Sequence, residues 1–314
     1  MTNRLDTAGR IDRSKPISFR FNGKGYVGYQ GDTIASALLA NGVKVIGRSW
    51  KYHRARGFMG DGVEEANGLF QVQTGAKTIP NVRGTQAEIY EGLEFTSTNA
   101  WPNPNFDVLA LFGKFSFMLP AGFYYKTFMW PAKLWMTYEH IIRKASGLGV
   151  APKEQDTDHY EKTNEHCDVL VVGAGPSGIV AALHAARADA RVLLVDEQSE
   201  MGGRLLSQNV QIEGNASSEW LRSALLELQA FENVTLLGRT TAFGYHDGNF
   251  VTAVQRLTDH LPESKQRGAR EKVFRIRAKQ VILATGAHER PIPFGYNDRA
   301  GVMLASAVSS YVVR

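Results

Sequence analysis

The sequence contains a single cysteine, Cys167, and this scarcity excludes two kinds of architecture. One cysteine forms no internal disulfide framework and cannot supply the ligands of a cysteine-bound metal cluster. Long apolar runs are also missing: residues 115–125 are interrupted by Pro120 and Gly122 and fall short of the roughly 18–20 residues of a membrane span. The polar residues 1–15 do not form a secretory signal. We therefore expect a cytoplasmic protein without a metal site or a membrane partner.

A strong excess of one charge sign is absent as well. The net charge is +5, and the 21% of charged and 43% of hydrophobic residues are typical of a globular protein. The densest basic cluster, residues 48–57, interleaves cations with aromatic side chains, as in some proteins that bind single-stranded nucleic acid. A solvated or subunit-facing segment is the commoner explanation, so we expect no nucleic acid as partner. The length of 314 residues predicts two domains, since single cores rarely exceed roughly 250–300 residues.

Residues 1–98 predict a small domain of short strands and turns. The stretch 17–21 alternates apolar and polar residues, Asn22-Gly23 is a hairpin signal, and a second strand follows at 26–29. Asp32 is expected to cap a helix over 33–40 that Asn41-Gly42 ends. Two further strands are expected at 69–73 and 87–90. This order of elements is typical of a β-grasp, ferredoxin-like domain.

Residues 99–165 predict a connector and a linker. The connector is rich in large aromatic side chains, and a helix is expected over 131–146. So many large apolar groups cannot all face water, so the connector should pack on a domain or on a partner subunit. The sequence leaves both alternatives open. Residues 151–165 are polar and lead into the third region, 166–314.

Two apolar strand patterns, 169–172 and 192–195, enclose a glycine-rich loop and an alanine-rich helix pattern. In the loop Gly173-Ala-Gly175-Pro176-Ser177-Gly178, each glycine has an expected purpose. Gly173 permits the strand-to-helix turn, Gly175 lets the backbone approach a pyrophosphate, and Gly178 lets the helix pack close to the strand. The pyrophosphate is expected at the helix N-terminus. The alternative is a βαβ unit whose loop has lost its ligand.

Three further groups complete the predicted nucleotide site. Asp196, or its neighbour Glu197, ends the second strand, where a carboxylate can accept hydrogen bonds from ribose hydroxyls. The acid disfavours the 2′-phosphate of NADP because two negative groups would face each other. The loop Gly202-Gly203-Arg204 is expected near the second phosphate. The strand 281–284 runs into Thr285-Gly286, a small-residue turn that can approach the nucleotide.

Longer motifs resemble one family. They lie at 31–42, at 47–54 (Gly-Arg-Ser-Trp-Lys-Tyr-His-Arg), at 99–102, at 120–128 and at 284–291. By these motifs the sequence resembles the N-terminal part of the alpha subunit of bacterial heterotetrameric sarcosine oxidase. The glycine loop and the Ala-Thr-Gly turn are shared widely among flavoproteins with two dinucleotide-binding domains. The Lys-Tyr-His-Arg and Phe-Tyr-Tyr-Lys segments are far more restricted, and they carry the resemblance to this family.

The resemblance implies an oxidoreductase acting on CH–NH donors. The complete enzyme would demethylate sarcosine to glycine, pass the methyl carbon to tetrahydrofolate and form hydrogen peroxide. NAD would bind the glycine loop of this chain, whereas FAD would bind to the beta subunit, with FMN at the subunit interface. Beta, gamma and delta subunits would be the partners, and tetrahydrofolate would bind a C-terminal half that lies beyond residue 314.

The sequence departs from this pattern in two places. The loop 57–68 of the ferredoxin-like domain holds no cysteine, so we expect no iron–sulfur cluster there. The chain also stops at Arg314 within an expected helix, which predicts an incomplete Rossmann-type domain and an inactive, poorly soluble fragment. The fold class is therefore α/β, with a cluster-free β-grasp domain before a truncated FAD/NAD(P)-binding domain.

No catalytic residue can be named from the sequence. The histidines are scattered, and a surface or core position is expected for each, although Tyr52, His53 and Arg54 are candidates to approach a cofactor edge in the assembled enzyme. Two alternative functions stay open. One is an FAD-binding subunit of a related amine or opine dehydrogenase, and the other is a non-catalytic structural subunit.

Overall fold

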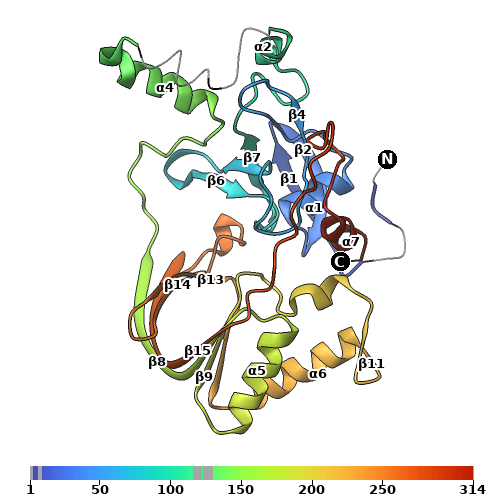
Figure 1. Ribbon diagram of the computed structural model, residues 1–314, viewed down its shortest axis with the longest axis vertical. Coiled ribbons are helices and arrows are strands. Elements are labelled where there is room, and N and C mark those ends of the chain that lie inside the picture. The colour runs from blue at the N-terminus through green and yellow to red at the C-terminus, as the bar shows by residue number, and fades with distance from the viewer. Residues whose placement is uncertain (1–2, 6–8, 116–121, 123–129, 314) are drawn as a thin grey trace. The chain divides into compact units, whose positions relative to one another are not determined.

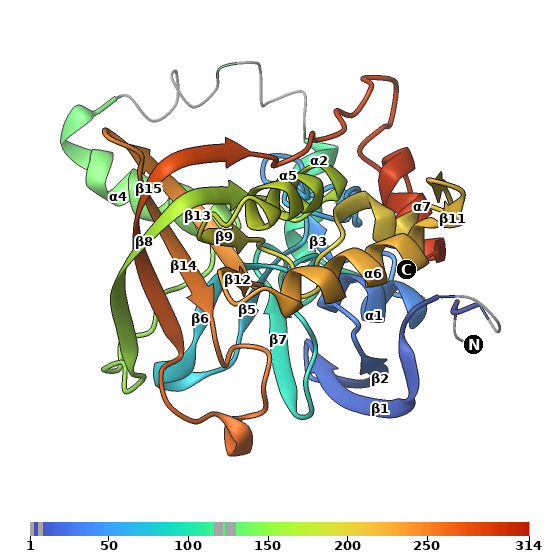
Figure 2. The same cartoon turned by 90° about the horizontal axis from the view of Figure 1, so that it is seen from below.

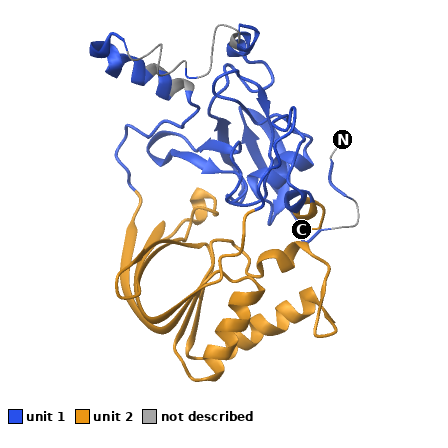
Figure 3. Cartoon of the chain, viewed as in Figure 1, with its two compact units in different colours: residues 1–157, 289–308 blue, residues 158–288, 309–314 orange. Residues whose placement is uncertain are grey.

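The computed structural model describes residues 3–5, 9–115, 122 and 130–313, and the following account is of these residues. They form two compact units (Figure 3). Unit 1 comprises residues 1–157 and 289–308, and unit 2 comprises residues 158–288 and 309–314. The motif 120–128 singled out in the sequence lies almost entirely outside the described residues.

Unit 1 contains a five-stranded sheet with one helix beside it (Figure 1). The middle strand β7 pairs in parallel with β1 and antiparallel with β5, and the outer strands β2 and β6 pair antiparallel with β1 and β5. In spatial order the strands are β2 (Lys24–Gln30), β1 (Asp12–Phe21), β7 (Leu93–Ser97), β5 (Leu69–Val72) and β6 (Ile79–Arg83). The predicted Asn22-Gly23 turn joins β1 to β2, with φ of 49° and 78° at its two residues.

Helix α1 (Ile34–Ala40) has Thr33 as its N-cap, so the cap and the first helical residue each lie one residue later than the sequence indicated. Thr33 and Ser36 form a reciprocal capping box, while Asp32 precedes the cap and accepts a hydrogen bond from the Ser36 hydroxyl at 2.7 Å. Four phenylalanines of the sheet pack ring against ring at centroid distances of 5.2–5.9 Å: Phe19, Phe21, Phe70 and Phe95. They form the core of unit 1 with the buried Ile34 and Leu38 of α1.

The strand expected at 87–90 is a single bridge between Glu88 and Thr33, and the strand of this region is β7. The rest of unit 1 consists of short elements. They are β3 (Gly47–Arg48), β4 (Ala55–Arg56), η1 (Gly75–Lys77), η2 (Val108–Ala110), α2 (Leu111–Lys114), η4 (Ala132–Leu134) and α4 (Trp135–Ala145). The predicted helix over 131–146 is present as η4 and α4. Several connector side chains are exposed, among them Trp101, Phe106 and Trp130, the last to 81%.

Unit 2 is built on a six-stranded sheet in which the four strands β12, β9, β8 and β15 run parallel. β14 and β13 extend it antiparallel beyond β15. In spatial order the strands are β12 (Val234–Leu237), β9 (Val192–Val195), β8 (Tyr160–Val172), β15 (Glu271–Leu283), β14 (Phe250–Arg256) and β13 (Thr240–His246). The strand pattern 281–284 of the sequence is the carboxyl end of the longer strand β15, which ends at Leu283.

The helices α5 (Pro176–Arg187) and α6 (Ser217–Ala230) lie side by side next to this sheet (Figure 2). Small side chains of α5, Ala182 and Ala186, are buried together with Ile179 and Leu183 against the strands β8 and β9. The remaining elements are η5 (Gly203–Ser207), β10 (Gln211–Ile212), β11 (Asn215–Ala216), η6 (Glu263–Lys265) and α7 (Ala305–Val313). Within the described ranges, no helix has the length and apolar character needed to cross a membrane.

The buried thiol of Cys167 gives a direct test of this packing. Cys167 lies in β8, is 6% exposed, and packs in a core cluster with Leu170, Val251 and Ile276. Burial raises the pKa of the Cys167 thiol to about 11, so only about a thousandth of it is thiolate at pH 8. We expect iodoacetamide at pH 8 to leave the folded protein unmodified while it labels one thiol per chain in urea. Rapid labelling without denaturant, measured by mass spectrometry, would contradict the packing.

Candidate dinucleotide-binding site

The carboxyl ends of three parallel strands meet at one edge of the sheet in unit 2. Val172 at the end of β8 is paired with Val195 of β9 on one side and with Leu283 of β15 on the other. The loop 173–178, the acids 196–197 and the turn 284–286 therefore leave the sheet at the same level. In open α/β sheets this edge, outside the carboxyl ends of the strands, is where ligands bind.

Two glycines of the first loop have a reason in the packing of the chain itself. Gly173 has φ of +101°, and a Cβ atom there would lie 2.3 Å from the carbonyl oxygen of Ala284. A Cβ atom at Gly178 would lie 1.8 Å from the carbonyl oxygen of Gly173. Gly173 thus allows the turn and the close approach of the 284–286 segment, and Gly178 allows α5 to pack against the loop.

Gly175 differs from both. Its φ of −74° suits any residue, and a Cβ atom there would meet no atom within 4 Å. Gly175 is the N-cap of α5, and neither a side-chain cap nor an acidic residue is found in the first turn of this helix. The N-terminal N–H groups of α5 therefore carry the positive end of the helix dipole beside an open space. This arrangement suits a negatively charged group of a ligand.

The second glycine pair lies directly against the first loop. Gly202 has φ of +139° and donates its N–H to the carbonyl of Ala174 at 2.9 Å. A Cβ atom at Gly203 would lie 2.9 Å from the Cα atom of Gly175, so only glycine allows the two loops to touch. Arg204 follows Gly203 within η5 and is partly buried. The structure thus brings together two glycine loops that are separated by 24 or more residues in the sequence.

The two acids after β9 have different surroundings. The carboxylate of Asp196 accepts the N–H of Ala174 at 2.6 Å and the N–H of Gln198 at 2.8 Å. Asp196 therefore fastens the first glycine loop to the end of β9, a role that residue type and spacing did not indicate. The Glu197 side chain is half-buried, and the described residues contribute no hydrogen bond or ion pair to its carboxylate.

The 284–286 turn completes the edge. The N–H of Ala284 donates to the carbonyl of Val172 at 2.8 Å, which continues the β8–β15 pairing by one residue. Thr285 and Gly286 are exposed, Gly286 has φ of +72°, and its Cβ atom would meet nothing within 4 Å. All the glycines predicted for the site, with Pro176, Ser177, Asp196, Glu197, Arg204 and Thr285, belong to unit 2.

The candidates of the motif 47–54 lie in unit 1. His53 is buried, has φ of +49°, and its Nδ1 atom lies 2.8 Å from the buried carboxylate of Asp107. Arg54 forms an ion pair with Asp298 at 2.9 Å, and Arg56 pairs with the same carboxylate. The sequence did not indicate the two acidic partners of this motif because they are distant along the chain. Asp107 lies 54 residues from His53, and Asp298 lies 244 residues from Arg54.

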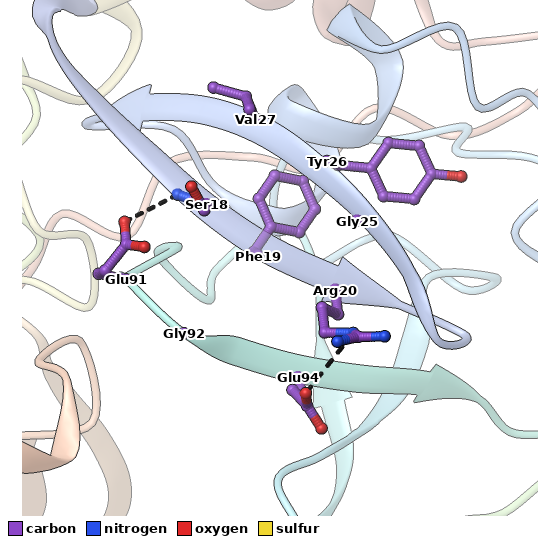
Figure 4. A pocket seen from close by; sticks show the side chains of 9 residues that line it. All are labelled: Ser18, Phe19, Arg20, Gly25, Tyr26, Val27, Glu91, Gly92 and Glu94. Atoms are coloured by element: carbon purple, nitrogen blue, oxygen red, sulfur yellow. Dashed lines mark hydrogen bonds and ion pairs between the residues drawn. The ribbon is translucent and has the colours of Figure 1, made fainter.

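Unit 1 has a depression of about 400 Å³ that is lined by residues of β1, β2 and the segment 91–94. Figure 4 shows the side chains of these residues. An ion pair of Arg20 with Glu94 and a hydrogen bond from the Ser18 N–H to Glu91 lie beside it. None of the residues predicted for the nucleotide site lines this depression. Over the described part of the chain, no group of three or more His, Cys, Asp or Glu side chains is placed to hold a metal ion.

Comparison with known proteins bears on both units. Residues 14–100 match the family described as 2Fe-2S iron-sulfur cluster binding domain, and residues 168–286 match the family described as FAD dependent oxidoreductase. A solved structure of L-proline dehydrogenase from P. horikoshii matches 91% of this chain and 44% of its own, with a TM-score of 0.56 and 20% sequence identity. The predicted α/β fold class, with a ferredoxin-like domain before an FAD/NAD(P)-binding domain, is confirmed.

Two relatives, one from each of the two enzyme families considered from the sequence, differ in how much of this chain they match. The A subunit of opine oxidase from Agrobacterium tumefaciens is 30% identical over 145 residues, 45% of this chain and 28% of its own length. The alpha subunit of sarcosine oxidase from Rhizobium meliloti is 52% identical over 312 residues, 99% of this chain. The chain spans about a third (32%) of the length of that relative. Along the whole of this chain, the resemblance to the alpha subunit of sarcosine oxidase is therefore confirmed.

Proposed function

We propose that unit 2 binds the ADP portion of a dinucleotide at the carboxyl edge of its parallel strands. The observation that supports this most is Gly175, a glycine that neither its φ nor its packing requires, at an uncapped helix N-terminus. The pyrophosphate would accept hydrogen bonds from the N–H groups of Ser177 and Gly178, next to Pro176. Gly202, Gly203 and Arg204 would lie on its second side, and the backbone of Thr285 and Gly286 would border the nucleotide.

We assign the ribose hydroxyls to Glu197 rather than to Asp196. Two hydrogen bonds from backbone N–H groups already engage the Asp196 carboxylate, whereas the Glu197 carboxylate receives none from the described residues. A carboxylate without such partners is the better acceptor for the hydroxyl groups of a ligand. Asp196 would then act indirectly, by holding Ala174 and the glycine loop in place.

FAD and NAD share the ADP portion, so both fit this arrangement. The match of residues 168–286 to FAD dependent oxidoreductases supports a flavin, and FAD is therefore the ligand that we favour. NAD, which the family resemblance implies, gains no support from that match and is the alternative. A bound flavin can accept one or two electrons, whereas NAD accepts two electrons together as a hydride.

We propose further that the chain serves in an enzyme of the sarcosine oxidase type. Such an enzyme would oxidise sarcosine to glycine and transfer the methyl carbon to tetrahydrofolate. Molecular oxygen would accept the two electrons and be released as hydrogen peroxide, and beta, gamma and delta subunits and FMN would complete the enzyme. The identity of 52% over nearly the whole chain supports this more strongly than the shorter, weaker match supports an opine-oxidising enzyme. The subunit name of the relative supports assembly with other chains, for which the exposed aromatic side chains of the connector offer apolar surface.

The Gly175→Val variant tests the nucleotide site. Valine has room in the free protein, so the fold should persist, but its side chain would fill the space beside the α5 N-terminus. In the parent protein, a ligand at 100 times its dissociation constant should raise the free energy of unfolding by about 2.7 kcal/mol. We expect Gly175→Val to abolish this rise.

FAD and NAD are titrated separately in thermal unfolding experiments, and any cofactor released by denaturation is identified by chromatography. Gly25→Val is the matched control, because Gly25 lies in unit 1 and a Cβ atom there also meets nothing within 4 Å. Stabilisation of Gly175→Val equal to that of the parent would contradict the site. Stabilisation by NAD alone would exclude FAD as the ligand.

Substitutions of Glu197 and Asp196 should change different quantities, the first the affinity for the dinucleotide and the second the free energy of unfolding. Glu197→Gln should weaken dinucleotide binding about tenfold, which corresponds to about 1.4 kcal/mol, and leave the free energy of unfolding nearly unchanged. Asp196→Ala removes the acceptor of two backbone N–H groups and should lower the free energy of unfolding by about 1–3 kcal/mol. Isothermal titration and urea denaturation measure the two quantities, with the exposed Glu232→Gln as control. Undiminished ligand affinity in Glu197→Gln would refute the assignment.

The activity is tested on the complete enzyme that contains this chain together with its partner subunits. With sarcosine as substrate, we expect glycine and hydrogen peroxide in equal amounts, and one-carbon transfer when tetrahydrofolate is present. An opine serves as the competing substrate under the same conditions. A kcat/KM for the opine above that for sarcosine would contradict the assignment, and so would turnover of neither compound.

A further inference from the structure

Residues 14–100 match a family described as binding a 2Fe-2S cluster, and the loop between β4 and β5 in unit 1, residues 57–68, lies within that range. Such clusters are bound by cysteine thiolates, with histidine replacing two of them in one class. The loop contains neither residue, and the single cysteine of the chain is buried in β8 of unit 2. The residues present therefore do not fit a cluster.

A buried glutamate lies inside the loop instead. The Glu65 residue is 2% exposed, and its carboxylate accepts four backbone N–H groups. Oε2 accepts from Met59 at 2.7 Å and from Gly60 at 2.8 Å, and Oε1 accepts from Asn67 at 2.6 Å and from Gly68 at 3.0 Å. Each carboxylate oxygen thus accepts two hydrogen bonds, and together they link residues 59–60 to residues 67–68 near the two ends of the loop.

The neighbouring Glu64 repeats this pattern on a smaller scale. Its Oε1 atom accepts the N–H groups of Asp61 at 2.8 Å and Gly62 at 3.0 Å. Burial alone would raise the pKa of Glu64, but hydrogen bonds from backbone N–H groups outweigh it and hold the pKa below its usual value. The glycines let the chain wrap this closely: a Cβ atom at Gly60 would lie 2.6 Å from the Glu64 carboxylate.

We infer that the ferredoxin-like domain of this chain takes no iron–sulfur cluster and that the Glu65 carboxylate holds the loop as an internal anion. Backbone N–H groups that converge on one point favour a negative charge there, and in iron–sulfur proteins such groups donate to the cluster sulfurs. Here Glu65 satisfies them from within the chain. The domain therefore carries no electrons by way of a cluster, and hydrogen bonds to Glu65 close its loop without a bound group.

Cluster binding is measured on the purified chain before and after anaerobic incubation with ferrous iron, sulfide and a thiol reductant. We expect no stoichiometric iron or acid-labile sulfide after desalting, and no visible absorption of a 2Fe-2S centre. Two irons and two sulfides per chain would overturn the inference. This outcome is independent of dinucleotide binding, which concerns residues of unit 2.

The role of Glu65 is measured by hydrogen–deuterium exchange in Glu65→Gln and Glu65→Ala. Glutamine keeps one acceptor oxygen, so one pair of N–H groups, either 59 and 60 or 67 and 68, should exchange about tenfold to a hundredfold faster. Alanine should accelerate both pairs, and Glu94→Gln, which removes an exposed carboxylate of the same unit, should accelerate neither. If Glu65→Ala does not fold, the pairwise effect in Glu65→Gln decides. Parental exchange rates at all four N–H groups in Glu65→Gln would overturn the role.

Discussion

The peptide groups around Ala174 connect the three loops at the carboxyl edge of the sheet in unit 2. The N–H of Ala174 donates to the Asp196 carboxylate after β9, and its carbonyl accepts the N–H of Gly202. The neighbouring Gly173 touches the backbone of Ala284 after β15. The loop 173–178 therefore contacts the segments after both β9 and β15, and a shift of the segment after β9 would leave polar groups of Ala174 without their partners. The conformation of Gly175 and of the α5 N-terminus depends on these contacts.

The glycines at this edge of the sheet differ in whether the packing of the chain requires them. At Gly173, Gly178 and Gly203 a side chain would collide with backbone atoms, so these glycines are needed to build the edge whether or not a ligand binds. At Gly175 no such collision occurs. A spacing pattern in the sequence does not separate these two reasons, because both produce the same residue. The three-dimensional surroundings separate them, and they leave Gly175 as a glycine that the packing of the described residues does not require.

Local patterns predicted those parts of the fold that depend on local interactions. The alternation of β1, the Asn22-Gly23 turn, the periodicity of α5 and the apolar run of β9 were all recognisable. The parts that were missed depend on partners far away in the sequence. β8 begins at Tyr160, before its apolar part, because its polar residues pair with β15 more than 100 residues later. The sequence likewise identified Asp196 as an acid after a strand, but its bond to Ala174 became visible only in three dimensions.

Backbone N–H groups converge at several places among the described residues, and three of these places bear on the proposals made above. Glu65 accepts four of them in unit 1, and Asp196 accepts two in unit 2. At the N-terminus of α5, by contrast, no capping side chain and no first-turn acid is found among the described residues. Leaving such groups unpaired costs free energy that water or a ligand must offset. Glu65 and Asp196 supply a carboxylate to the N–H groups around them, whereas the described residues supply none at the α5 N-terminus, which supports the proposal that an external anion binds there. The phosphates of a dinucleotide match it in charge, and the adjoining glycine loops leave room for them.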